Sequence, residues 1–191
     1  MSAQTSALKR VLRDTRRRLQ EFEIARRSHH VSVLFVSYPK AGRTWLRFLI
    51  ANYLNSAYAL GEAVSLETMF RIVPNWDLDP VRGLSAFAHG SVSGLPLVVS
   101  THRPWRRSFE VLDVPVLVKV RDPRDLLVSA YFHETRHKRR LDAGISEFLR
   151  DGEYGVTSFV RYMNTLSAGL AGRRHLIVPY EQLSAEPVTT A

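Results

Sequence analysis

Residues 31–47 read VSVLFVSYPKAGRTWLR. The run begins with five apolar residues among its first seven, mostly β-branched or aromatic, which is typical of a buried strand. A Tyr-Pro pair ends this run, Lys40 and Gly42 follow, and a new apolar pattern opens near Thr44. The stretch therefore predicts a strand, a tight turn that carries a cation, and the start of a helix.

The rest of the chain continues this alternation of strand and helix. Strands are predicted at Val31–Tyr38, Leu95–Thr101, Val114–Val120 and His175–Tyr180. Helices are predicted at Thr44–Ala57, Arg124–Thr135, Ile145–Arg150 and Val156–Leu170. This order favours an α/β fold with three layers, in which a parallel sheet of about four to five strands is flanked by helices. Residues 60–94 have no clear period, and we expect a long insertion over the carboxyl edge of the sheet.

Length and composition indicate one folded domain. The chain has 191 residues, of which 45% are hydrophobic, so a substantial core can form. Residues 1–28 are predicted to form a basic amphipathic helix, and residues 29–191 a single domain. That helix could dock on the domain, or lie on a membrane or on nucleic acid.

The formal net charge of +9 favours anionic partners, although a basic composition by itself locates no site. The chain contains no cysteine, no apolar window long enough to span a membrane and no signal-peptide pattern at its start. We therefore expect a cytoplasmic protein without a membrane span. His29 and His30 stand in the tail, so no metal site is expected.

The turn at 38–45 has the features of an anion site. Anions bind at helix N-termini beyond the carboxyl ends of parallel strands. Gly42 allows close backbone approach, Thr44 offers a hydroxyl, and Lys40 adds a positive charge. Lys40 precedes the glycine instead of following it, so this is no Walker A loop and an ordinary NTPase is disfavoured. A turn with a solvated lysine remains the alternative.

A second candidate anion site lies in VKVRDPRDLLVSAY, residues 118–131. Arg121 ends an apolar strand, Pro123 opens a helix that Asp122 could cap, and Ser129 lies about two turns into it. Arginine suits forked recognition of a phosphate. His102 ends another predicted strand at the same edge, where a neutral imidazole could accept a proton from a hydroxyl; a purely structural histidine is the alternative.

The segment YPKAGRTW at 38–45 resembles the 5′-phosphosulfate loop of the sulfotransferase family, whose members use 3′-phosphoadenosine 5′-phosphosulfate (PAPS) as donor. The resemblance implies a P-loop-NTPase-like sulfotransferase fold. Family members usually have Ser at the place of Ala41 and often Thr at that of Arg43. The implied donor contacts in this loop are Lys40, Ala41, Gly42, Arg43, Thr44 and Trp45.

Three more segments share the resemblance. Arg121 and Ser129 match the motif that holds the 3′-phosphate. His102 matches the catalytic base, while Ser100 stands where many members have a lysine that assists the reaction. Tyr180, in a late YEQL segment, matches a tyrosine near the adenine.

The resemblance implies transfer of a sulfuryl group from PAPS to a hydroxyl or amine, with Lys40 on the leaving side, His102 as base, adenosine 3′,5′-bisphosphate (PAP) as product and no metal. The acceptor would be a small molecule or glycan, anionic if the basic clusters at 103–107 and 136–140 face the site. Trp76 and Trp105 could stack on it or pack in the core. No nucleic-acid partner is expected, and the oligomeric state stays open.

The resemblance spans about residues 31–187 and lacks the family's usual C-terminal Gly-rich segment. The domain is therefore expected to be short at its C-terminus, as a fragment or a compact variant. Three alternatives stay open: a nucleotide-binding protein without turnover, a P-loop-type kinase, and nucleic-acid binding through the basic N-terminal helix.

Overall fold

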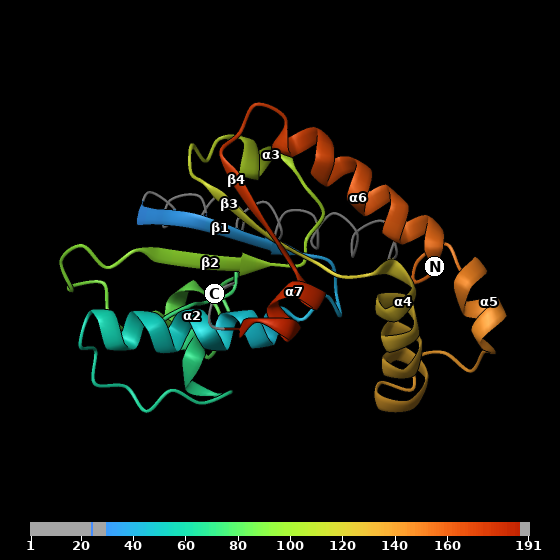
Figure 1. Ribbon diagram of the computed structural model, residues 1–191, viewed down its shortest axis with the longest axis horizontal. Helices are drawn as coiled ribbons and strands as arrows, with labels where there is room; N and C mark the ends of the chain where they lie inside the picture. Colours follow the sequence, from blue (N-terminus) through green and yellow to red (C-terminus); the bar gives the residue numbers. More distant parts are fainter. Residues whose placement is uncertain (1–23, 25–29, 188–191) are drawn as a thin grey trace, which may run out of the picture.

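A computed structural model describes residues 24 and 30–187. The predicted basic helix at 1–28 lies outside the described residues, apart from Ile24, which is buried. The described strands form one sheet in the order β2-β1-β3-β4, and every neighbouring pair is parallel (Figure 1). Their bounds are β1 Val31–Ser37, β2 Leu97–Thr101, β3 Val116–Val120 and β4 His175–Pro179.

The strand order creates a switch point at β1. The chain passes from β1 to β2 on one side, and then to β3 on the other side. Ser37 pairs with Lys119, and Val36 with Thr101, so the three carboxyl ends are level. The loops after β1, β2 and β3 therefore leave the sheet side by side, which is where α/β proteins bind ligands.

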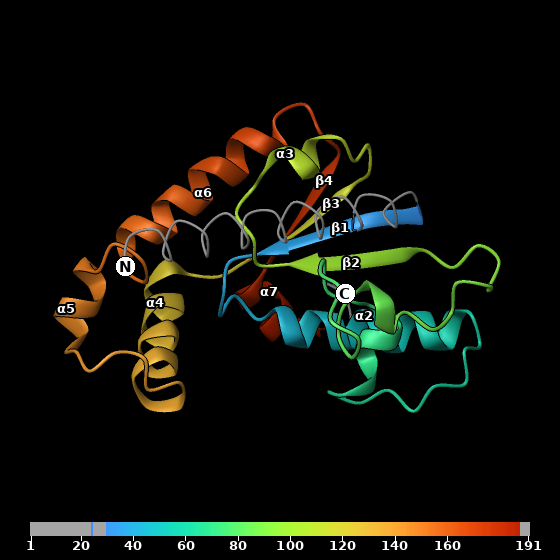
Figure 2. The same ribbon diagram turned by 180° about the vertical axis from the view of Figure 1, so that it is seen from behind.

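Helices cover both faces of the sheet, as Figures 1 and 2 show from opposite sides. The helices are α2 Arg43–Ala57, η2 Thr68–Arg71, η3 Leu84–Ala86, α3 Arg107–Glu110, α4 Pro123–Phe132, η4 His133–His137, α5 Ile145–Arg150, α6 Val156–Leu170 and α7 Tyr180–Ala185. Alternate residues of β1 face opposite layers: Phe35 packs with α2, while Leu34 and Val36 pack with α3 and α6. The expected three-layer α/β fold is confirmed.

Most predicted elements agree with the structure to within two residues at each end. The main difference follows α4, which ends at Phe132 and continues as a π-helical turn, η4, where an α-helix to Thr135 was predicted. The predicted cap is present, because the Asp122 side chain accepts a hydrogen bond from the Arg124 N–H at 2.8 Å. None of the described helices is long and apolar enough to cross a membrane.

The segment at 60–94 differs from the expectation of an insertion over the carboxyl edge. Its middle does lie there, because the Trp76 N–H donates to the Ser100 carbonyl at 2.8 Å and the Ser100 N–H to that of Pro74 at 2.9 Å. Residues 84–95, however, run to the opposite end of β2, where Leu84 lines a cavity with Leu97. The segment therefore contacts both ends of β2, and not its carboxyl end alone.

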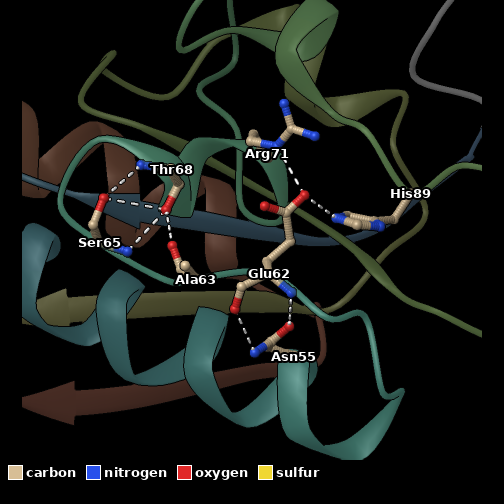
Figure 3. A network of polar contacts seen from close by, with 7 residues as sticks. All are labelled: Asn55, Glu62, Ala63, Ser65, Thr68, Arg71 and His89. Atoms are coloured by element: carbon tan, nitrogen blue, oxygen red, sulfur yellow. Dashed lines mark hydrogen bonds and ion pairs between the residues drawn. The ribbon is translucent and has the colours of Figure 1, made fainter.

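A polar network ties the start of this segment to α2 (Figure 3). The Asn55 side chain donates to the Glu62 carbonyl at 3.0 Å and accepts from the Glu62 N–H at 2.9 Å. The Glu62 carboxylate lies 2.8 Å from Arg71 Nε and 3.1 Å from His89 Nε2. The hydrogen bond from Arg71 is the main reason why the pKa of Glu62 is lowered. These contacts connect α2, η2 and the loop at His89.

The packing of α6 against α3 depends on a glycine. The Trp105 ring lies so close to Gly169 that a Cβ there would overlap the ring. Trp105 in turn packs edge-on against the buried Phe109 of α3, with ring centroids 5.8 Å apart. The position of α6 on the sheet is therefore set partly by the lack of a side chain at residue 169.

We predict that Gly169→Ala destabilises the protein by up to about 2 kcal/mol. Helix propensity alone would predict a gain of about 1 kcal/mol, but overpacking against Trp105 costs about 1–3 kcal/mol. Denaturant unfolding measures the difference. Gly152→Ala is the control, because a Cβ at Gly152 meets no atom within 4 Å. A stabilised Gly169→Ala variant would contradict this packing.

Candidate functional site

A cavity of about 1080 Å³ opens at the carboxyl edge of the sheet. It is bounded by the loop after β1, the end of β2, the helices α4 and α5, and one face of α6. The sequence-predicted residues that line it are Lys40, Gly42, Arg43, Thr44, Trp45, His102, Arg121, Ser129 and Tyr180. Ala41 is the exception, because it is buried and packs with Leu126 and Leu127 of α4. The fold therefore brings four separate sequence segments to one cavity: the turn at 38–45, His102, Arg121 with Ser129, and Tyr180.

The turn after β1 has an unusual backbone. Lys40 and Gly42 both have positive φ, 70° and 87°, and the Ala41 N–H donates to the Tyr38 carbonyl at 3.3 Å. Gly42 is the N-cap of α2, and no side chain of the described chain caps this helix. The first turn of α2 also contains no acidic residue. Its free N–H groups and the helix dipole therefore suit a bound anion.

The ring of Tyr180 holds this turn against the ends of β3 and β4. A Cβ at Gly42 would lie 2.6 Å from a Tyr180 ring carbon, so only glycine fits. The Arg121 guanidinium stacks on the same ring at 4.4 Å, and Trp45 meets it edge-on at 5.6 Å. Tyr180 thus contacts three of the residues that the sequence assigned to anion binding.

Arg121 is held close to the turn but keeps donor capacity. Its Nη1 donates to the Lys40 carbonyl at 3.4 Å, while its buried Nε has no hydrogen-bond partner among the described residues. The N-terminus of α4 is already capped by Asp122, so its N–H groups are less available than those of α2. An anion at this second position would rely on the side chains of Arg121 and Ser129, as the sequence predicts.

The hydrogen bonds of His102 determine which of its nitrogens is basic. Its Nδ1 lies 2.8 Å from the Ser37 carbonyl and 3.1 Å from Ser37 Oγ. Because a carbonyl oxygen only accepts, Nδ1 carries the hydrogen and donates it. Burial, and then the positive charge of Arg43, lower the pKa of His102 to about 3. The ring is therefore neutral near pH 7, with its lone pair on Nε2 and the ring at the cavity wall.

A buried arginine fills the space around Ser100. Arg47 Nη2 donates to Ser100 Oγ and, at 2.6 Å, to Asn75 Oδ1, and its guanidinium stacks over Phe70 at 4.5 Å. Burial lowers the pKa of Arg47 to about 9, which leaves it charged near pH 7. A cation therefore reaches Ser100 from α2, at the place where the family often has a lysine on the strand itself.

Sequence reasoning missed several residues of the site. Lys119 is buried beneath Gly42, where its Nζ donates to the Pro179 carbonyl at 3.0 Å and burial lowers its pKa to about 8. A lysine within the apolar run VPVLVKV, residues 114–120, is a sequence signal for a buried cation. Ser37 and Tyr162 could not be found in this way. The sequence around Ser37 does not indicate that it meets His102, and the sequence around Tyr162 does not indicate that it lies near Arg43.

The predicted acceptor contacts divide into two groups. Trp76 and Trp105 pack on Phe109 in the core, with ring centroids 5.6 and 5.8 Å away, and do not line the cavity. Of the basic cluster at 136–140, Arg140 lines the cavity and lies 3.4 Å from Glu134. For the two tryptophans, packing in the core is therefore the correct alternative.

The chain is similar to known sulfotransferases. It is 32% identical over 104 residues to human (Homo sapiens) sulfotransferase 2A1, covering 52% of this chain and 34% of that protein. It is 32% identical over 102 residues to a 3-alpha-hydroxysteroid sulfotransferase of Cavia porcellus, covering 51% and 32%. Mouse sulfotransferase SULT7A1, solved in complex with PAP, has a TM-score of 0.55 at 18% identity and shares the fold over 84% of this chain and 55% of that one.

The matched region therefore spans only about a third of the curated relatives 2A1 and 3-alpha-hydroxysteroid sulfotransferase. The family model described as "Sulfotransferase domain" matches residues 31–191, which include the turn after β1, His102, Arg121 and Tyr180. This match covers most of the chain, and it includes every loop that lines the cavity. The chain belongs to the sulfotransferase family.

Proposed function

We propose that the protein transfers a sulfuryl group from PAPS to a hydroxyl or amine, with His102 as the general base. The observation that carries this proposal is the hydrogen bond from His102 Nδ1 to the Ser37 carbonyl, which leaves Nε2 as a neutral base beside an anion site. The cavity volume of about 1080 Å³ leaves room for a nucleotide and a second molecule.

The donors that line the cavity fit a nucleotide with two separate anionic groups. Lys40 and the free N–H groups at the start of α2 would hold the 5′-phosphosulfate, with Gly42, the backbone of Arg43, and Thr44 in the same turn. Arg121, whose Nε lacks a partner among the described residues, and Ser129 would hold the 3′-phosphate. Trp45 and Tyr180 would offer aromatic surface beside the adenine. The PAP complex of the mouse relative supports this choice of nucleotide.

When bound, PAPS supplies the sulfuryl group: a bond from sulfur to the acceptor oxygen forms while its bond to the 5′-phosphate oxygen breaks. His102 Nε2 takes the proton that the acceptor hydroxyl loses. Lys40 and the N-terminus of α2 stabilise the negative charge that grows on the leaving phosphate. Ser100 cannot supply a cation, and Arg47, which donates a hydrogen bond to Ser100 Oγ, would supply the positive charge at that place.

We predict that wild-type protein binds PAP and that Lys40→Ala and Arg121→Ala each weaken binding about 10- to 100-fold. Each variant loses charge-assisted hydrogen bonds to a phosphate, worth about 1.5–3 kcal/mol. Calorimetric titration measures the affinities. Arg124→Ala is the matched control from the same RDPR motif, because Arg124 is 88% exposed and pairs with Asp122. If the wild type fails to bind PAP, the proposed function is wrong.

We predict that His102→Gln lowers the rate of sulfuryl transfer about 10²- to 10⁴-fold and leaves PAP affinity within about twofold of wild type. The amide cannot accept the acceptor's proton, whereas the phosphate contacts lie elsewhere. Transfer of label from ³⁵S-PAPS to an acceptor set measures the rate. Undiminished transfer would remove His102 as the base, and PAP binding without transfer by the wild type would indicate a nucleotide-binding protein without turnover.

We predict that kcat/KM for transfer stays level as the pH falls from about 8 to about 5. The pKa of His102 is lowered from 6.5 to about 3, so the base form persists far below the ordinary histidine range. A pH–rate profile tests this, together with the ring resonances of His102 in an NMR titration. An acidic limb near pH 6.5 that disappears in His102→Gln would contradict the environment described for this ring.

A further inference from the structure

One face of α6 forms a polar wall of the cavity. The residues of α6 that line it are Ser158, Arg161, Tyr162 and Thr165. Their spacing of three, four and seven residues places them on a single helix face. All four end in a hydroxyl or a guanidinium, whereas Leu166 and Leu170 of the same helix are buried in the core. Tyr38, which follows β1, contacts this wall: its hydroxyl is 3.5 Å from Ser158 Oγ.

Tyr162 is the most buried member of this wall. The residue is 4% exposed, and the Tyr38 ring packs edge-on against its ring with the centroids 5.0 Å apart. Within residues 24 and 30–187, its hydroxyl has no hydrogen-bond partner. Burial raises the pKa of Tyr162, so the hydroxyl stays protonated. Because Tyr162 lines the cavity, a ligand atom there that accepts this hydrogen bond would satisfy the hydroxyl.

Arg43 reaches the same region from the start of α2. Burial lowers the pKa of Arg43 to about 10, and the electrostatic effect of Tyr162 is the largest of those that raise it. Arg43 forms no hydrogen bond and no ion pair with the rest of the described chain, and the charge of Asp77 acts on it from beyond ion-pair distance. A partly buried guanidinium without a carboxylate partner is therefore available to a ligand.

The remaining charges of the cavity leave a cationic excess at this wall. Lys40 and Arg121 belong to the proposed donor site, and Arg140 is paired with Glu134. Arg43 and Arg161 remain, and Glu153, at the start of the loop before α6, is the one other acidic side chain among the described lining residues.

We propose that this wall binds an acceptor that carries a negatively charged oxygen group, such as a carboxylate, in addition to the hydroxyl that receives the sulfuryl group. The inference rests on the proposed function and defines its acceptor class. The Arg43 guanidinium pairs with the anionic group, the Tyr162 hydroxyl donates a hydrogen bond to it, and Arg161 adds charge at the rim. The acceptor hydroxyl lies toward His102, which takes its proton.

This preference separates the chain from a relative named for steroid acceptors, the 3-alpha-hydroxysteroid sulfotransferase of Cavia porcellus. A neutral, apolar acceptor offers no partner to Arg43 or to the Tyr162 hydroxyl, and it leaves both groups desolvated and unpaired. Groups left unpaired in this way discriminate strongly against a ligand that lacks the matching atom.

Two matched probes test the proposal: 4-hydroxyphenylacetate and 4-hydroxyphenylacetamide, which have the same size and differ in charge. Each is titrated into the full chain, alone and saturated with PAP. We expect the acid to bind about 10- to 100-fold more tightly than the amide, because only the carboxylate forms charge-assisted, two-pronged hydrogen bonds with the Arg43 guanidinium. Arg43→Gln should reduce that ratio to near one, and Tyr162→Phe should lower it severalfold while the ring packing is kept.

Arg174→Gln is the control for net charge, because Arg174 is exposed in the turn before β4 and does not line the cavity. It should keep both the ratio and the PAP affinity of wild type. The proposal is overturned if the acid does not bind, if the amide binds as tightly as the acid, or if Arg43→Gln keeps the ratio. These outcomes differ from failure of the proposed function, which appears as loss of PAP binding or of sulfuryl transfer by the wild type.

Discussion

The contact between Tyr180 and Gly42 is the constraint on which the site depends. The ring leaves no room for a side chain at residue 42, and Gly42 itself has a positive φ that favours glycine. Because Arg121 and Trp45 pack on the same ring, one aromatic side chain relates the turn after β1 to the end of β3. The separation between the two predicted phosphate positions is thereby defined by packing at the end of β4.

The second constraint is electrostatic. Burial is the main reason why the pKa of His102 is lowered, and the positive charges of Arg43, Arg47 and Lys40 lower it further. A cluster of cations is what an anionic donor needs, and the same cluster keeps the nearby imidazole neutral. The hydrogen bond to Ser37 then selects Nε2 as the basic nitrogen. The proposed anion binding and the proposed proton acceptance would therefore depend on the same arrangement of charges.

Much of the fold was predictable because its signals are local. The strand, turn and helix at 31–57 are encoded by one apolar run, a Tyr-Pro break and a second apolar period. Asp122 before Pro123 likewise predicted its helix cap. The position of the segment at 60–94 was predicted only in part. The segment lacks periodicity, and its contacts with β2 depend on residues distant in the sequence, such as Ser100. The π-helical turn at His133 also had no sequence signal.

The parallel α/β order, the two candidate anion motifs and the histidine at a strand end could all be predicted, because each depends on residues close together in the chain. The surroundings of these motifs depend instead on the tertiary fold. Arg47 and Ser100 are 53 positions apart, and Ser37 and His102 are 65 apart, yet each pair is hydrogen-bonded. Such pairs form because the fold places β2 beside both β1 and α2, and the local sequence pattern of a segment does not show which segment will lie next to it.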